Sequence, residues 1–253
     1  MISIPEAYLK NRSEARRSRL PLDYDIFIRR SSLLPSFARG TAHAIVEYME
    51  LPDEVGIMTL PNAILFPQAL LPLYIFEPRY RAMLKQSLES QRMFAVALPH
   101  AHESSNPSLV PHRVAGVGLI RACVDKPDGT SNLILQGVSR VRFTDFVQEK
   151  PYYVARIAVL STEESDALEV EALSVKVLEM IGVMHDAGEI QAEGIMKFLN
   201  EITDYDALAD IVTYSFIEDV TRKQEILETL NLRQRLQKVI VALRHQSSGP
   251  KLG

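Results

Sequence analysis

Two short, proline-punctuated stretches decide the fold: LPNAILFP at residues 60–67 and LPLYIFEPRY at residues 71–80. Proline restricts the backbone to extended segments and bends, and these stretches hold prolines at positions 61, 67, 72 and 78. Proline cannot donate to a sheet ladder, so we expect any strands here to be edge strands or interrupted ones. The same prolines argue against a membrane-spanning helix, although residues 55–76 carry no charge.

The chain that follows, as far as Ser161, has the pattern of strands. Short apolar or alternating runs separated by turn residues predict strands at Met93–Leu98, Val114–Cys123, Asn132–Val138, Val141–Val147 and Tyr153–Leu160. The sequence KPDG at 126–129 predicts a hairpin turn, with proline at the first central position and glycine at a left-handed one. One helix is expected within this region, from Pro78 to Leu88.

After Ser161 the apolar period changes to that of helices. Ser161 with Glu164, and Thr203 with Asp206, have the spacing of helix N-terminal caps. The last helical pattern is either a helix pair or one long helix with a joint at Asn231. We therefore predict four parts: an extension at 1–52, a β-rich part at 53–161, a helical part at 162–245 and a loose tail at 246–253.

Composition places the chain among ordinary globular proteins. It has 253 residues, of which 47% are hydrophobic and 24% charged. A single cysteine, Cys123, excludes an internal disulfide framework and a cysteine-cluster zinc site, and it fits a reducing compartment. The start of the chain lacks the apolar core of a signal peptide, so we expect a cytoplasmic location.

The charge distribution argues against a nucleic-acid partner. The formal net charge is −4, and residues 163–221 contain fifteen acidic residues against Lys176 and Lys197. An acidic block of that size would repel a phosphate backbone. We therefore expect neither a nucleic-acid nor a membrane partner.

The sequence motifs of common enzymes are missing. There is no Gly-Lys dipeptide for a phosphate loop, and neither G-x-S-x-G nor H-E-x-x-H occurs. His100, His102 and His112 lie in or beside a predicted loop with Glu103, and they are either exposed loop residues or a metal site that would support an unrecognised hydrolase. Cys123 lies in an apolar strand and is interpreted as an inert thiol. We expect no catalytic residues, no metal and no cofactor.

The proline-rich segment is the best candidate for a binding surface. Edge strands leave hydrogen-bonding groups free, so an extended peptide could pair with one. Phe66, Tyr74 and Phe76 would be the apolar anchors, and Glu77 and Arg79 would fix orientation. The alternative interpretation is that these aromatic residues complete the core of a small barrel.

Residues 60–84, LPNAILFPQALLPLYIFEPRYRAML, resemble the opening of the LON substrate-binding domain, the amino-terminal domain of the ATP-dependent protease Lon. The resemblance continues through GVG at 116–118, LQGVSRV at 135–141, YVAR at 153–156 and ALAD at 207–210, and covers about residues 55–243. It implies an α+β fold, with a PUA-like β pseudo-barrel followed by a helical bundle. Lon continues into ATPase and Ser-Lys protease modules that have no counterpart in these residues, so we expect no enzyme activity.

The resemblance also implies a function. A LON domain of this kind would be a non-enzymatic module that binds unfolded or damaged protein segments. A finer hypothesis makes it an adaptor in protein quality control, for a protease or ATPase on another chain. The alternative is a PUA-like reader of RNA or a small ligand, which would use the strand arginines Arg113, Arg121, Arg140, Arg142 and Arg156.

Overall fold

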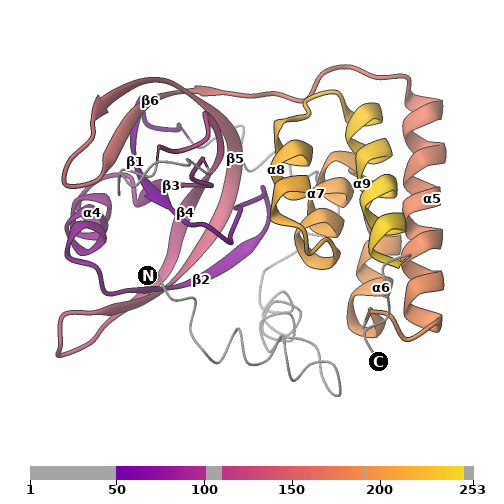
Figure 1. Cartoon of the computed structure of the whole chain (residues 1–253), viewed down its shortest axis with the longest axis horizontal. Coiled ribbons are helices and arrows are strands. Elements are labelled where there is room, and N and C mark those ends of the chain that lie inside the picture. Colours follow the sequence, from indigo (N-terminus) through magenta and orange to yellow (C-terminus); the bar gives the residue numbers. More distant parts are fainter. Residues whose placement is uncertain (1–49, 101–109, 191, 248–253) are drawn as a thin grey trace.

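The computed structural model describes residues 50–100, 110–190 and 192–247. Within them a β barrel and a helical bundle lie side by side along the long axis of the molecule (Figure 1). This is the α+β arrangement that the change of period at Ser161 predicted. Most of the predicted extension at 1–52, and residues 248–253 of the predicted tail, lie outside the described residues.

Five strands close the barrel: β1 (Glu54–Thr59), β3 (Met93–Ala97), β4 (Val114–Asp125), β5 (Ser131–Gln148) and β6 (Tyr153–Val159). β1 pairs in parallel with β3 and antiparallel with β6. β4 joins β3 to β5, and the second half of β5 pairs with β6, which completes the ring. The interior is filled by Val55, Ile57, Met93, Ala95, Ala97, Ala115, Val117, Val141, Phe143 and Ala155.

The remaining strand, β2 (Leu70–Ile75), lies outside this ring and pairs only with β5 among the described strands. Pro72 sits in it, as expected of an edge strand. Leu71, Leu73 and Ile75 are buried, whereas the residues between them are half-buried. One face of β2 therefore belongs to the core, and the other faces outward.

The segment between β1 and β2 is a buried loop. Its main chain lies directly on glycines of the barrel: a Cβ at Gly116 would be 1.9 Å from the Leu65 carbonyl oxygen, and one at Gly137 would be 1.9 Å from the Phe66 carbonyl oxygen. The side chains of Leu65 and Phe66, which belong to this loop, are completely buried. The first proline-rich stretch, at 60–67, thus forms core, and only the second includes an edge strand.

The predicted turn and strands are largely confirmed. Gly129 has a φ of +77°, and the Lys126 N–H donates to the Thr130 carbonyl oxygen at 2.8 Å, closing the hairpin between β4 and β5. The prediction of separate strands at Asn132–Val138 and Val141–Val147 was wrong, because β5 runs through both. Register shifts within its pairing with β4 and β6 let this long strand bend without breaking.

The helices match the predicted pattern and differ mainly at their ends. Helix α4 (Pro78–Glu89) covers one side of the barrel, and the bundle consists of α5 (Ala167–Asp186), α6 (Glu193–Glu201), α7 (Tyr205–Phe216), α8 (Val220–Glu228) and α9 (Leu232–Ser247) (Figure 1). The last two are a pair, and Asn231 caps α9 by accepting from the Gln234 N–H. Gln246, predicted to lie in the loose tail, belongs to α9 and donates to the Phe216 carbonyl oxygen at 2.8 Å. None of the described helices is long and apolar enough to cross a membrane.

The predicted helix caps were wrong by a few residues. Asp166 caps α5 by accepting from the Glu169 N–H, and Asp204 caps α7 by accepting from the N–H groups of Asp206 and Ala207. Aspartate is as good a cap as serine or threonine, so the spacing rule could not choose between neighbouring candidates. The prediction that the chain leaves a closing strand and enters a helix soon after Thr162 is confirmed.

The outer side of the barrel and the bundle share one apolar core, whereas the barrel interior forms a separate cluster. Buried residues of the loop at 60–66, of β2 and of α4 belong to the same contiguous cluster as the inward stripes of α5, α7 and α9. The change of period at Ser161 therefore marks a change of architecture without a break in the core.

Candidate functional site

The outward face of β2 presents two stacked aromatic rings. Tyr74 and Phe76 are both half-buried, with ring centroids 5.7 Å apart and planes inclined by 28°. They share this face because side chains two residues apart point the same way from an extended chain. The Lys126 Nζ lies 4.6 Å from the centroid of the Tyr74 ring, within range of a cation–π contact.

The apolar surface continues across the sheet. Pro72 pairs with Ile134, which pairs with Ala122, and Tyr74 pairs with Asn132, which pairs with Val124. Val124 is 63% exposed, a large fraction for a valine in a strand. We call this surface the outer-face patch; it consists of Pro72, Tyr74, Phe76, Ala122, Val124 and Ile134.

Glu77 and Arg79 lie at the end of the patch and are paired with each other. The Arg79 Nε donates to the Glu77 Oε2 at 2.8 Å. The Arg79 guanidinium also lies 4.4 Å from the centroid of the Tyr80 ring. Both charged groups are therefore held in place next to Phe76, at the start of α4.

Phe66 does not belong to this surface. Its side chain is completely buried, because the loop that carries it packs against Gly116 and Gly137 of the barrel. The expectation that Phe66 is a surface anchor was wrong, and the core interpretation holds for this residue. Tyr74 and Phe76 remain accessible.

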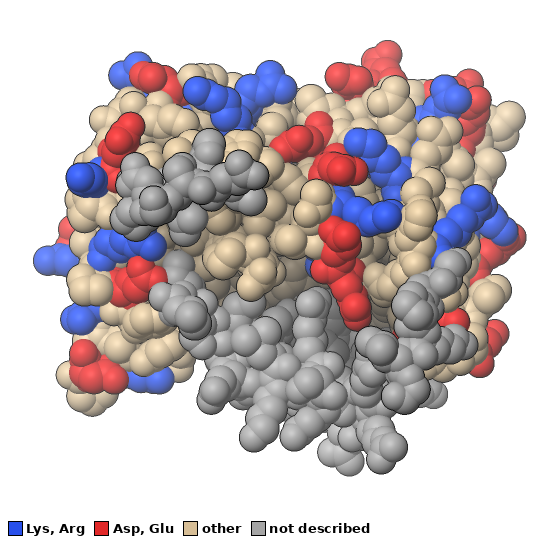
Figure 2. Space-filling model, in the orientation of Figure 1, with Lys and Arg blue, Asp and Glu red and all other residues tan. Residues whose placement is uncertain are grey.

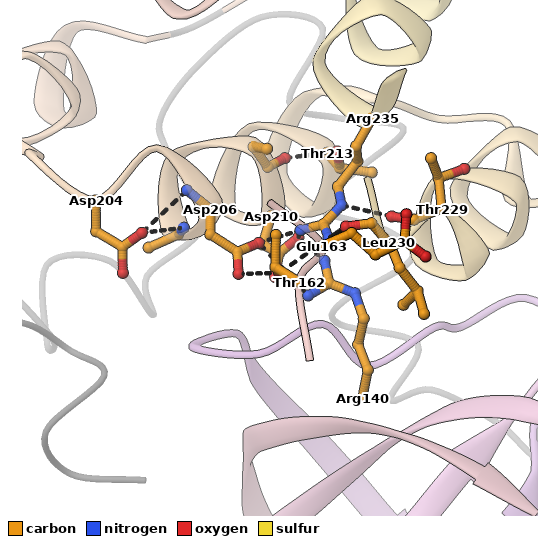
Figure 3. Close-up of polar contacts among 12 residues, drawn as sticks. Arg140, Thr162, Glu163, Asp204, Asp206, Asp210, Thr213, Thr229, Leu230 and Arg235 are labelled. Atoms are coloured by element: carbon orange, nitrogen blue, oxygen red, sulfur yellow. Dashed lines mark hydrogen bonds and ion pairs between the residues drawn. The ribbon is translucent and has the colours of Figure 1, made fainter. Parts of the chain in front are cut away.

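A second polar feature, between barrel and bundle, is an ionic cluster of two arginines and two aspartates (Figure 3). Arg140 extends from β5 and bonds to Asp210 on α7, and both side chains are almost fully buried. Arg235 extends from α9 to Asp206, and its Nε donates to the Thr229 carbonyl oxygen at 2.8 Å. Thr162, between β6 and α5, donates to Asp206. The cluster thus ties four segments of the chain together.

Burial and neighbouring charges shift the pKa values of the two aspartates in opposite directions. Burial raises the pKa of Asp210 to about 6, although Arg140 and Arg235 act against it. Burial also acts to raise the pKa of Asp206, but the guanidiniums of Arg235 and Arg140 outweigh it, and this pKa lies below its usual value. Burial, followed by the charge of Arg140, lowers the pKa of Arg235.

Sequence reasoning missed this cluster. The available signal was Asp206 and Asp210, one turn apart on the apolar stripe of a helix, together with Arg140 in a strand. The cavity beside the cluster has a volume of about 120 Å³ and is lined by Gln68, Arg140, Thr162, Asp204 and Asp206, among others. Pockets for small organic ligands usually measure roughly 300–1,000 Å³, so the cluster is better understood as a structural joint.

Comparison with known families decides the classification. The family model for the substrate-binding domain of the ATP-dependent protease La (LON) matches residues 54–245. The chain belongs to the LON substrate-binding domain family. This confirms the resemblance carried by residues 60–84 and the later motifs.

Curated relatives of this LON domain include Lon proteases from several bacteria. The Lon protease of Dictyoglomus thermophilum is 26% identical over 191 residues, which cover 75% of this chain and 24% of that protein. The Lon protease of Desulfosudis oleivorans is 28% identical over 207 residues, which cover 81% of this chain and 25% of that protein. The chain therefore spans about a quarter of the length of these relatives.

Solved structures confirm the fold of the LON domain. The N-terminal domain of the Mycobacterium avium complex Lon protease aligns with a TM-score of 0.62 at 18% identity, covering 76% of this chain and 98% of that domain. A Lon N-terminal domain protein from Xanthomonas campestris aligns with a TM-score of 0.51, also at 18% identity, covering 74% and 97%. No ATPase or protease domain is found in this chain by these comparisons.

The histidines of the predicted loop are only partly described in this LON domain. The rings of His100 and His112 stack with centroids 3.9 Å apart, and the His112 Nδ1 lies 3.3 Å from the Glu228 Oε1. His102 and Glu103 lie outside the described residues. In the described ranges no three histidine, cysteine or acidic side chains gather as a metal site would require.

Cys123, in β4, is half-buried. Its side chain lies on the opposite face of the sheet from the outer-face patch and packs against the core. Burial, followed by the charge of Asp125, raises the pKa of its thiol. A raised pKa lowers the thiolate fraction at neutral pH, and the thiolate is the nucleophile. This agrees with the interpretation of Cys123 as an inert thiol.

The strand arginines proposed for an RNA reader are largely engaged within the protein. Arg140 is buried in the ionic cluster, and Arg156 pairs with Glu54 and Asp145. The Arg113 Nη1 donates to the Phe143 carbonyl oxygen at 3.1 Å. Figure 2 shows basic and acidic residues interspersed on the visible face. Arg140 is therefore not available to contact RNA. The absence of a nucleic-acid partner stays a prediction.

Proposed function

We propose that this LON domain is a non-enzymatic module that binds unfolded or damaged segments of other proteins at the outer-face patch. The observation that carries the proposal is the stacked pair Tyr74 and Phe76, at the end of β2 and just beyond it, which is partly accessible although the alternate residues Leu71, Leu73 and Ile75 are core. Partly accessible aromatic side chains held on a rigid surface are the kind of group that dominates protein–protein binding energy.

The patch has the features of a small recognition surface. Its aromatic centre is flanked by exposed apolar side chains such as Val124, and by the charged pair of Glu77 and Arg79. Because the sheet beneath is paired and packed, the side chains are held in place before a client arrives. Binding to such a surface loses little conformational entropy on the side of the LON domain.

A role as an adaptor in protein quality control is the finer form of this proposal. The family relationship supports it, because the relatives that share this domain are named Lon proteases. In this proposal a protease or ATPase on another chain acts on the client, and the LON domain supplies recognition. Purified protein should then show no ATP-stimulated cleavage of an unfolded substrate.

Fluorescence anisotropy with a permanently unfolded client, reduced and carboxymethylated α-lactalbumin, tests the proposal. Tyr74→Ala and Phe76→Ala should each weaken binding about thirtyfold, which corresponds to about 2 kcal/mol, with unchanged circular dichroism. Leu168→Ala is the matched control, because Leu168 is 76% exposed on α5, away from the patch. Equal affinities for the wild-type protein and both aromatic variants would refute the proposal.

A further inference from the structure

We propose that the client binds as an added β-strand along the outer edge of β2, where no described strand pairs with it. This inference rests on the proposed function, because it specifies how the outer-face patch would hold a protein segment. The occupant is an extended segment with apolar residues at alternate positions and acidic residues at one end. It is identified by the main-chain groups, side chains and charges that this edge presents.

The hydrogen-bonding direction of each residue in β2 follows from two contacts. The Gly137 N–H donates to the Ala69 carbonyl oxygen at 2.8 Å, on the side of β5. Main-chain groups of successive residues point to opposite sides of a strand, so Leu71, Leu73 and Ile75 bond to β5, whereas Leu70, Pro72 and Tyr74 point away. The Tyr214 Oη on α7 donates to the Leu70 carbonyl oxygen at 2.8 Å, which is consistent with this assignment.

The open part of the edge therefore begins after Leu70 and is centred on Tyr74. Helix α7 covers the Leu70 end through Tyr214, and β2 ends at Ile75. On the outward side, the described residues provide no main-chain partner for Pro72 or Tyr74. This leaves the Pro72 carbonyl and both the N–H and the carbonyl of Tyr74 for an incoming strand.

Pro72 limits what this edge can accept. It has no N–H, so Tyr74 supplies the only outward donor within β2 beyond Leu70. A single donor fixes the register of an added strand and cannot support pairing along a whole sheet edge. The edge is thus protected against open-ended aggregation while it still offers a short docking segment.

Side chains and charges define the segment that fits. Alternate residues of an added strand would lie next to the Tyr74 and Phe76 rings, which favours apolar residues there. At the hairpin turn the Arg81 guanidinium lies against Gly129, and Lys126 lies over Tyr74. Neither cation lies within ion-pair distance of an acidic side chain among the described residues, although Asp128 of the same turn, whose pKa is lowered by hydrogen bonds from Thr130 and also by the charge of Lys126, partly offsets the latter. A client with acidic residues at that end would complement them.

Peptides methylated on main-chain nitrogens test strand addition directly. The probe is a short synthetic peptide of alternating valine and threonine with glutamates at one end, together with two analogues N-methylated on one or the other alternate set of residues. We expect one analogue to lose about tenfold or more in affinity and the other to bind like the parent, because only one set faces β2. Equal binding of both analogues and the parent would overturn strand addition.

Amide exchange in the intact protein provides a second test. Saturation with the parent peptide should slow exchange of the Tyr74 N–H about tenfold or more and leave that of Leu73, already bonded to β5, unchanged. An unprotected Tyr74 N–H at saturation would contradict the inference. Lys126→Glu should lower the affinity for the glutamate-ended peptide about fivefold and raise the affinity for a matched peptide that ends in lysines. Unchanged affinities for both peptides would exclude the proposed acidic end of the client.

These outcomes separate the two proposals. If Tyr74→Ala weakens capture of the unfolded client but N-methylation has no effect, the patch binds clients through side chains and strand addition is wrong. If neither aromatic variant affects the unfolded client, the proposed function itself is wrong.

Discussion

The Arg140 guanidinium on β5 is bonded to the Asp210 carboxylate on α7, with both side chains shielded from solvent. Arg235 and Asp206 complete the charge balance from α9 and α7. The relative position of barrel and bundle thus depends on an ionic joint as well as on apolar packing.

Breaking this joint from one side should destabilise the protein strongly. Arg140→Met leaves Asp206 and Asp210 with a single guanidinium, and we expect a loss of about 3–5 kcal/mol in the free energy of unfolding. The double variant Arg140→Met with Asp210→Leu should recover more than half of that loss, because it leaves the balanced Asp206–Arg235 pair. Urea denaturation measures both, and additive losses in the double variant would contradict this account.

The free energy of unfolding should change with the titration of Asp210 between about pH 4 and pH 6. Because its pKa is raised to about 6, the folded state binds a proton that the unfolded state has released in this range. Stability should therefore fall as the pH rises through this window, on the order of 1–3 kcal/mol relative to the trend of Asp210→Asn. The lowered pKa of Asp206 acts in the opposite sense and at lower pH. Parallel pH profiles of the two proteins would show that Asp210 does not titrate there.

Truncation should separate the buried and exposed aromatic residues of the proline-rich segment. Phe66→Ala should cost about 3–5 kcal/mol, because the ring is fully enclosed by core. Tyr74→Ala should cost only about 1 kcal/mol, because its ring is half-buried and not enclosed by core. Thermal and urea unfolding give both values. Similar losses would contradict the difference in burial between the two rings.

Alanine substitutions at two glycines, Gly116 and Gly182, should change stability in opposite directions. Gly116→Ala places a methyl group against the Leu65 main-chain carbonyl, which cannot rotate away, so we expect a loss of about 1–3 kcal/mol. Gly182→Ala, in the last turns of α5, meets nothing within 4 Å and should gain about 0.5–1 kcal/mol. A neutral Gly116→Ala would show that the loop at 60–66 moves freely on the barrel.

Much of the fold was predictable because its signals are local. Alternation in Tyr153–Leu160, the turn at 126–129 and the helical stripes each fix an element without reference to the rest of the chain. Strand β5 was divided wrongly because the bend in it depends on register shifts against two partners, which a single strand does not reveal. The burial of Phe66 likewise depends on Gly137, far along the sequence, whose missing side chain makes room for its main chain.

The candidate site was predictable only in part. Proline density located the segment and the edge strand, but it could not show which aromatic residues stay accessible, because that depends on which face of β2 meets the core. Val124 and Ile134 lie in the patch because of the register between β2, β5 and β4, which the sequence alone does not specify. The ionic cluster combines residues from β5, α7 and α9, so no local pattern could assemble it.

The place of β1 in the ring has a consequence for biosynthesis. Its neighbours are β3 and β6, and the pairing of Glu54 with Arg156 joins the first strand of the barrel to the last. A nascent chain leaving the ribosome therefore exposes an incomplete sheet until β6 has emerged. Closure then requires contacts between distant parts of the sequence, which are slow to form. During its own synthesis this LON domain therefore exposes unpaired strand segments, the kind of segment that we propose it recognises in other proteins.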